Sequence, residues 1–219
     1  MRIEEAKEKG IDLEELKQEQ KKLAKAVSQK DAFDFSVAQR FGGIISETVG
    51  KQIVSAIVVL NENFEVIDQK FSIQKPQFPY IPGFRAYREL RVMLDAYNKL
   101  EEKPDVVFVF GHGISHPRGC GIATHFALSI QKPTIGIAKS LVCGEEKDNQ
   151  VYLLKKIIGE KVVTKEGSRP FYVSVGNDIS LKTAVELTKK QVRENHKLPE
   201  PLIEVRKFVK EVRKEVVKV

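Results

Sequence analysis

Residues 105–138 read DVVFVFGHGISHPRGCGIATHFALSIQKPTIGIA, and this stretch decides the fold. The continuous apolar run at 105–110 is typical of a strand covered on both faces. A glycine-rich loop over 111–121 follows, and the pattern then predicts a helix over 122–130 and a second short buried strand over 134–138. Alternation of strands and helices over so short a length indicates an α/β fold.

Upstream, the sequence predicts strands joined by turns. Strands are expected over 32–37, 53–60 and 64–73. Asn61-Glu62-Asn63 supplies turn residues between the last two, so an antiparallel hairpin is expected there. Apolar residues at helical spacing predict helices over 2–28 and 84–100.

Downstream, strands are expected over 151–164 and 171–175, and helices over 181–195 and 202–217. Antiparallel strands followed by strand–helix alternation predict a mixed central sheet flanked by helices on both faces. Neither an internal repeat nor a low-complexity linker divides the chain. One domain over 1–219 is therefore expected, with an N-terminal helix within 1–30 and a C-terminal helix within 199–219.

Composition narrows the class of protein. With 42% hydrophobic residues among 219, the chain can form a sizeable core, which argues against disorder. No run of 18 apolar residues is present, and Met1–Gln20 lacks the apolar core of a signal peptide, so a cytoplasmic protein without a membrane span is expected. Cys120 and Cys143 fit a reducing compartment. The net charge of +7 fits a nucleic-acid partner, or merely a surface rich in Lys and Glu.

Two acidic residues are candidates for chemistry. Asp34 lies inside the predicted strand at 32–37, where an unpaired carboxylate is costly to bury. It is either a metal ligand or part of a polar face opposite Phe33 and Phe35. Glu89 follows Arg85 and Arg88 near the start of a predicted helix, so a surface ion pair is the alternative to a functional role.

The glycine-rich loop is the third candidate. Its glycines allow the backbone to approach a ligand, and His116 and Arg118 are suited to contact a phosphate. The loop lacks the Lys-Ser/Thr ending of a P-loop, which excludes a nucleotide triphosphatase of that type. The spacing of His112, His116 and His125 does not match a helical zinc motif.

Three segments together resemble the endonuclease V family in order and spacing. They are FPYIPGFRAYRE at 78–89, GHGISHPR at 111–118 and PTIGIAKS at 133–140. The resemblance runs from about residue 30 to residue 180, and Asp34 matches the family's first metal carboxylate. It implies an RNase H-like fold with a mixed central sheet.

The resemblance also implies a function. Members use magnesium or manganese to hydrolyse a phosphodiester near deaminated bases, chiefly inosine, in DNA, with RNA as a further substrate. This implies a DNA-repair endonuclease, expected to act as a monomer. Hard divalent cations prefer carboxylate oxygens and activate water, and base recognition outside the stack needs a wedge and a pocket.

By resemblance, residues divide into three roles. Asp34 and Glu89 would hold the metal, and Asp34, Glu89, His116 and Lys139 would form the catalytic set. Tyr80, Ile81, Pro82 and Gly83 would wedge into the duplex and seat the flipped base. Gly111, Gly113, Gly121 and Arg118 would contact substrate, with His116, Arg118 and Lys139 along the phosphate path.

This chain departs from the family at two positions. Phe110 stands where the strand normally closes with an acidic metal ligand, and Asn177, followed by Asp178, stands where a metal-proximal histidine is common. The leading interpretation is a metal-dependent repair endonuclease whose cleavage Phe110 weakens or abolishes while nucleic-acid binding is retained. The alternative is a non-catalytic binder of inosine-containing or branched nucleic acid. A further interpretation is that Phe110 is a core residue and that a nearby acid supplies the ligand.

Overall fold

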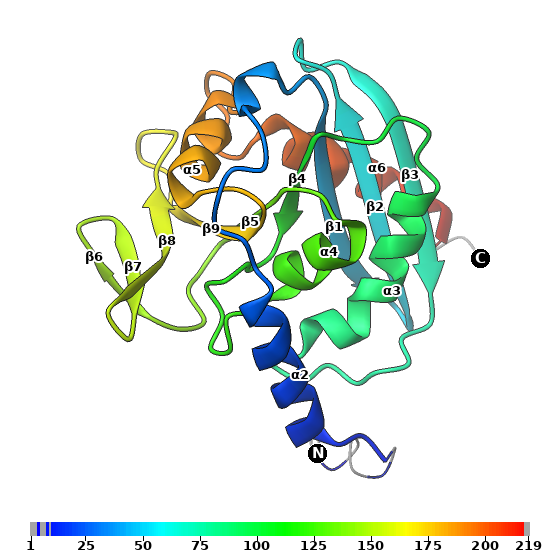
Figure 1. Cartoon of the computed structure of the whole chain (residues 1–219). Helices are drawn as coiled ribbons and strands as arrows, with labels where there is room; N and C mark the ends of the chain where they lie inside the picture. Colours follow the sequence, from blue (N-terminus) through cyan, green and yellow to red (C-terminus); the bar gives the residue numbers. More distant parts are fainter. Residues whose placement is uncertain (1–3, 5–7, 9, 217–219) are drawn as a thin grey trace.

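The computed structural model describes residues 4, 8 and 10–216, and its strands form one sheet (Figure 1). The described strands are β1 (Phe41–Val49), β2 (Gln52–Leu60), β3 (Val66–Gln74), β4 (Val106–Phe110), β5 (Thr134–Ala138), β6 (Glu145–Lys147), β7 (Gln150–Leu153), β8 (Lys156–Val162) and β9 (Phe171–Asn177). The described helices are α2 (Leu13–Lys25), the 3-10 turn η1 (Phe35–Val37), α3 (Arg85–Asn98), α4 (Ile122–Ile130), α5 (Leu181–Lys190) and α6 (Glu200–Val216).

The sheet is mixed, as the sequence predicts. Its order is β3-β2-β1-β4-β5-β9-β8-β7-β6. β4 runs parallel to both β1 and β5, and the other neighbours are antiparallel. The β2–β3 hairpin that turns at 61–63 is confirmed.

Helices cover both faces of the sheet, which also confirms the expected layers. α3 and α4 pack on one face over a cluster that includes Ile44, Val107 and Val109 (Figure 1). α5 and α6 pack on the other face, over residues such as Ile45 and Phe108. Alternate residues of β1 and β4 therefore enter different cores, as pleated strands require.

The predicted strand over 32–37 is wrong, and the first strand lies further on, at β1. Asp34 instead caps η1, where its carboxylate accepts a hydrogen bond from Ser36 N at 2.9 Å. β1 contains Gly42-Gly43, which resembles a turn in sequence. A Cβ at Gly43 would lie 2.1 Å from the carbonyl oxygen of Pro201, so this glycine lets α6 pack directly on the strand.

Other helix and strand boundaries differ from the predicted ones because of local backbone conformation. The strand predicted over 151–164 is two strands, β7 and β8, because Leu154 and Lys155 turn the chain at φ 49° and 65°. The helix predicted over 2–28 is interrupted: residues 4 and 8 are helical, Gly10 follows at φ 67°, and α2 then begins at Leu13, where Asp12 caps it through Glu14 N at 2.8 Å. The part of that prediction over 2–3, 5–7 and 9 lies outside the described residues. Among the described helices, none combines the length and the apolar character needed to cross a membrane.

Candidate nucleic-acid site

The candidate site lies where the parallel strands end. β4 ends at Phe110, and β5 is followed directly by Lys139. In the β1–β4 pairing Ile44 lies beside Val109, so Ile45 and Phe110 are the next neighbours, on the face that α6 covers. Ligands of α/β sheets commonly bind outside such carboxyl ends.

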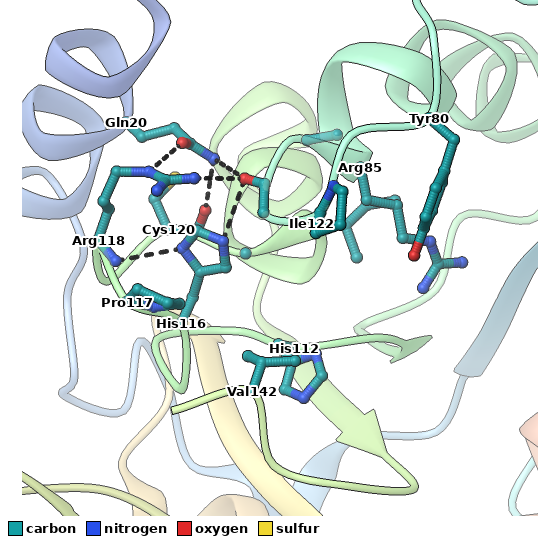
Figure 2. A pocket seen from close by; sticks show the side chains of 14 residues that line it. Gln20, Tyr80, Arg85, His112, His116, Pro117, Arg118, Cys120, Ile122 and Val142 are labelled. Carbon is teal, nitrogen blue, oxygen red and sulfur yellow. Dashed lines mark hydrogen bonds between the residues drawn. The ribbon is translucent and has the colours of Figure 1, made fainter. Parts of the chain in front are cut away.

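A pocket of about 520 Å³ opens beside these strand ends (Figure 2). It is lined by the end of the Tyr80–Gly83 loop, the start of α3, the glycine-rich loop and one residue of α2. Its lining includes Tyr80, Gly83, Arg85, His112, His116 and Ile122. Tyr80 is 47% exposed, whereas Ile81 is buried in a cluster with Phe78 and Phe84. The size suits a small aromatic group such as a nucleobase.

Hydrogen bonds to one backbone carbonyl, that of Gly83, hold the loop that carries Tyr80 in place. The oxygen of Gly83 accepts hydrogen bonds from Gln20 Nε2 at 3.1 Å, His116 Nε2 at 3.2 Å and Arg118 Nη2 at 2.6 Å (Figure 2). Gln20 is buried on α2, a residue that the sequence analysis did not single out. Three side chains from two segments, α2 and the glycine-rich loop, therefore hold this loop in one position.

The other hydrogen bonds of His116 and Arg118 keep both side chains directed at the Gly83 carbonyl. Arg118 N donates to His116 Nδ1 at 3.3 Å, so Nε2 carries the hydrogen that reaches Gly83. Burial, helped by the Arg118 charge, lowers the pKa of His116 to about 4, so the ring is neutral near pH 7. Arg118 also donates from Nε to Gln20 Oε1 at 2.5 Å and stacks on the Phe84 ring at 4.6 Å. The sequence placed both residues on a phosphate path, but their polar groups are engaged inside the protein.

The glycines of the loop allow close packing of the backbone. A Cβ at Gly113 would lie 1.9 Å from the Val175 carbonyl oxygen of β9. Added Cβ atoms at Gly111 and Gly121 would also collide with neighbours. The expected role of these three residues in substrate contact stays a prediction, and the structure gives them a packing role.

Glu89 is buried at the first turns of α3 and is paired with Arg85. Arg85 Nε lies 2.8 Å from Glu89 Oε2. The same guanidinium donates from Nη1 to the carbonyl oxygen of Phe110 at 2.9 Å and from Nη2 to that of Ser46 at 3.4 Å. Arg85 thus joins α3 to the end of β4 and to Ser46 within β1.

Two further cations lie against the Phe110 ring. Lys139 Nζ is 5.3 Å from the ring centroid, and the guanidinium carbon of Arg206 on α6 is 5.8 Å from it. Within the part of the chain that the structure describes, neither cation has a carboxylate partner. Arg206 was missed from the sequence, because a single basic residue on an amphipathic helix carries no motif.

Asp34 does not join Glu89, which corrects the expected metal pair. Asp34 precedes β1, and nearby Ala32 donates its N–H to the carbonyl of Asp178. Asp178 follows β9, next to the start of β5, so this segment lies at the amino ends of the parallel strands (Figure 1). Asp34 is exposed there, away from the end where Phe110 and Arg85 meet.

Asn177 also lies at that opposite end. It pairs with Thr134 at the start of β5, and its Oδ1 accepts from Ser28 N at 2.8 Å. Its Nδ2 donates to Asp178 Oδ2 at 2.8 Å. Asn177 and Asp178 therefore lie at the opposite end of the parallel strands from Phe110, whereas Arg206 lies beside the Phe110 ring.

The residues at the strand ends do not fit a divalent cation. Magnesium requires oxygen ligands, commonly one or two carboxylates. Ile45 and Phe110 are apolar, and Glu89 is already paired with Arg85. Glu47, further along β1, is paired with Arg213 at 3.0 Å and supplies no free acid. Over residues 4, 8 and 10–216, no cluster of three or more His, Cys, Asp or Glu side chains could hold a metal.

The mixed sheet flanked by helices, with a pocket of about 520 Å³ and two cations beside Phe110 at its parallel strand ends, defines an α/β protein with a site suited to an anionic ligand. The sequence model of the Endonuclease V family matches residues 21–205. This chain belongs to the endonuclease V family. Hydrolysis of phosphodiesters fits that family, and the family is metal-dependent.

Named relatives agree with this assignment. Endonuclease V of Thermosipho melanesiensis is 38% identical over 205 residues, which cover 89% of this chain and 85% of the relative. The crystal structure of human ENDOV matches with a TM-score of 0.85 at 28% identity, covering 94% of this chain and 100% of that one. Endonuclease V of Ciona intestinalis, solved with a 24mer DNA containing an inosine followed by a ribo-adenosine, matches with a TM-score of 0.84. Its identity is 23%, over 93% of this chain and 98% of that one, so it supports the fold alone.

Proposed function

We propose that this protein binds nucleic acid containing deaminated bases, chiefly inosine, and that its metal-dependent cleavage is strongly weakened or lost. The observation that carries the proposal is that Phe110, which ends β4, and Ile45, the β1 residue just beyond the Ile44–Val109 pair, both face one apolar cluster and offer no oxygen ligand. By family resemblance, the setting is DNA repair in the cytoplasm by a monomer, with RNA as a further substrate.

Recognition is supported by the pocket and the loop beside it. The pocket has room for a base, and the half-exposed Tyr80 ring stands at its lining. A protein that holds a base outside the base stack of the duplex needs an aromatic or apolar side chain on a rigid loop beside a pocket. The net charge of +7 favours binding to a phosphate backbone.

Weak cleavage is supported by the chemistry of the strand ends. Hydrolysis through a metal requires an ion held within about 0.5 Å of its productive position. Glu89 alone, engaged by a guanidinium, cannot set that geometry, and the cations around Phe110 repel a metal ion. The side chains here favour an anion over a cation.

A slow metal-dependent endonuclease is the second candidate. Glu89 and Lys139 are retained, and magnesium can be held partly by substrate phosphate and water. This candidate requires Arg85 to release Glu89 when substrate binds. Measurable nicking would support it.

Binding and nicking assays on the same duplex separate the two candidates. We expect tighter binding, by about tenfold or about 1.4 kcal/mol, of a fluorescent duplex with one inosine than of its adenine control, in EDTA. With magnesium or manganese, the wild-type protein should leave the strand intact, and the double variant Ile45→Asp/Phe110→Asp should gain nicking. Nicking by the wild type at a rate that Phe110→Asp does not change would overturn weakened cleavage.

A further inference from the structure

We propose that Arg85, Lys139 and Arg206, here called the cationic centre, bind a backbone phosphate of the nucleic acid directly, without a divalent cation. This inference rests on the proposed function, since it names the part of the ligand that this centre takes. It assigns to Arg206 a role that neither the family motifs nor the sequence pattern indicated.

The three cations come from separate elements and meet around one residue. Arg85, from α3, contacts the Phe110 backbone at 2.9 Å. Lys139, after β5, and Arg206, from α6, lie at 5.3 and 5.8 Å from the Phe110 ring centroid. An aromatic ring attracts cations to its face, so Phe110 holds like charges near each other where they would otherwise repel.

The charge of the centre is incompletely neutralised. Glu89 offsets Arg85, because the two side chains form an ion pair at 2.8 Å. Lys139 and Arg206 have no carboxylate partner within the described residues, although Arg206 is half-buried. A half-buried guanidinium without a counter-charge is costly, and an anionic ligand would offset that cost.

Arg85 connects the cationic centre to the base pocket. It lines the pocket, and Figure 2 shows its side chain on the same side of the pocket as Tyr80. A nucleotide whose base enters the pocket would therefore carry its adjacent phosphate towards Phe110. Arginine binds phosphate through two parallel N–H groups, and lysine adds a point charge.

This arrangement binds a phosphodiester but does not cleave it. The three side chains donate hydrogen bonds to a phosphate, but none generates a hydroxide as a bound metal does. The centre is therefore suited to hold the intact strand.

Fluorescence anisotropy with an inosine-containing duplex in EDTA tests the centre. We expect Arg206→Gln and Lys139→Gln each to weaken binding by about 5- to 10-fold and to lower the salt slope by about one. Lys210→Gln, an exposed lysine on the same helix α6, is the matched control and should change the affinity less than about twofold. Magnesium should not tighten wild-type binding.

The outcomes separate this inference from the proposed function. If Arg206→Gln and Lys210→Gln behave alike while inosine is still preferred, the cationic centre is wrong and the proposed function stands. If the two variants weaken binding but inosine is not preferred, the phosphate site stands and the proposed function fails. Loss of wild-type binding in EDTA would overturn metal-free binding. Thermal unfolding of each variant shows whether a loss of affinity reflects a loss of folding.

Discussion

The residue at the end of β4, Phe110, determines whether the strand ends attract a cation or an anion. An acid there would draw a metal ion, whereas the Phe110 ring gathers Lys139 and Arg206. Ile45 on the neighbouring strand offers no oxygen either. With these two apolar residues and the two cations beside them, the strand ends favour an anion over a metal ion.

Tyr80 is the residue on which base recognition most depends. Its half-exposed ring can stack on a base or fill the space that a flipped base leaves. Stacking of this kind contributes about 1–3 kcal/mol per base. We therefore expect Tyr80→Ala to weaken binding of the inosine duplex by about 5- to 100-fold and to remove most of the preference for inosine over adenine, measured by competition anisotropy.

Tyr80→Phe is the matched control, because it keeps the ring and removes only the hydroxyl. It should retain most of the inosine preference. An unchanged preference in Tyr80→Ala would mean that the pocket discriminates bases without this ring.

Only some of the individual site residues could be predicted from the sequence. Phe110 and Glu89 could be singled out because a motif surrounds them. Asp34 was misplaced, because a carboxylate between two phenylalanines resembles a strand centre, whereas its hydrogen bond to Ser36 N makes it the cap of a turn. Arg206 could not be found, because only the packing of α6 on the sheet brings it to Phe110.

Among the elements, α2 has the clearest effect on the site. Its buried Gln20 reaches the carbonyls of Gly83 and Cys120 and accepts a hydrogen bond from Arg118. Gln20→Ala would leave buried polar groups unpaired, at a cost of about 1–3 kcal/mol each. We expect a looser Tyr80 loop, lower stability to urea and a weaker inosine preference.

The salt dependence of binding distinguishes this role from a phosphate contact. Because Gln20 touches no phosphate in this account, Gln20→Ala should leave the salt slope unchanged. Lys21→Ala, at the neighbouring exposed position on α2, should leave base preference and stability unchanged. A change in salt slope with Gln20→Ala would contradict the positioning role.

The pattern predicted most elements with strong periodicity or turn residues, such as the β2–β3 hairpin. β1 was missed because Gly42-Gly43 is read locally as a turn. The reason for the glycine at 43 is non-local, since α6 packs against it from far along the sequence. Local propensity cannot register such a contact, and the same limit hid the role of Gln20.

For the whole molecule, three histidines, two in the glycine-rich loop and one on α4, predict that acid lowers the stability of the fold. Burial is the main cause that lowers the pKa values of His112, His116 and His125, that of His116 to about 4. Between about 4 and the ordinary 6.5, the unfolded chain binds a proton at His116 that the native state does not. The contribution of His116 to the free energy of unfolding is therefore fully present above pH 6.5 and is lost as the pH falls toward 4.

Urea unfolding at pH 7 and pH 5 measures this loss. The His116 share should be about 2 kcal/mol at pH 5, since one pKa unit corresponds to about 1.4 kcal/mol. His116→Gln should be less stable at pH 7 but lose less on acidification. Equal acid sensitivity of the variant and the wild type would show that His116 is not the residue responsible.

The family fold thus supports a site of altered charge. The mixed sheet, the fastened Tyr80 loop and the base pocket need no metal, because hydrogen bonds and apolar packing hold them. The residues that disfavour a metal ion are confined to the strand ends. Under the proposed function, this separation allows recognition without cleavage.

Titration of the protein with Mn²⁺, followed by electron paramagnetic resonance, tests the central claim most directly. We predict no saturable manganese site in the wild type, because Glu89 is paired and Ile45 and Phe110 supply no ligand. The Ile45→Asp/Phe110→Asp variant should gain one. A stoichiometric wild-type site that disappears in Glu89→Gln would contradict the account.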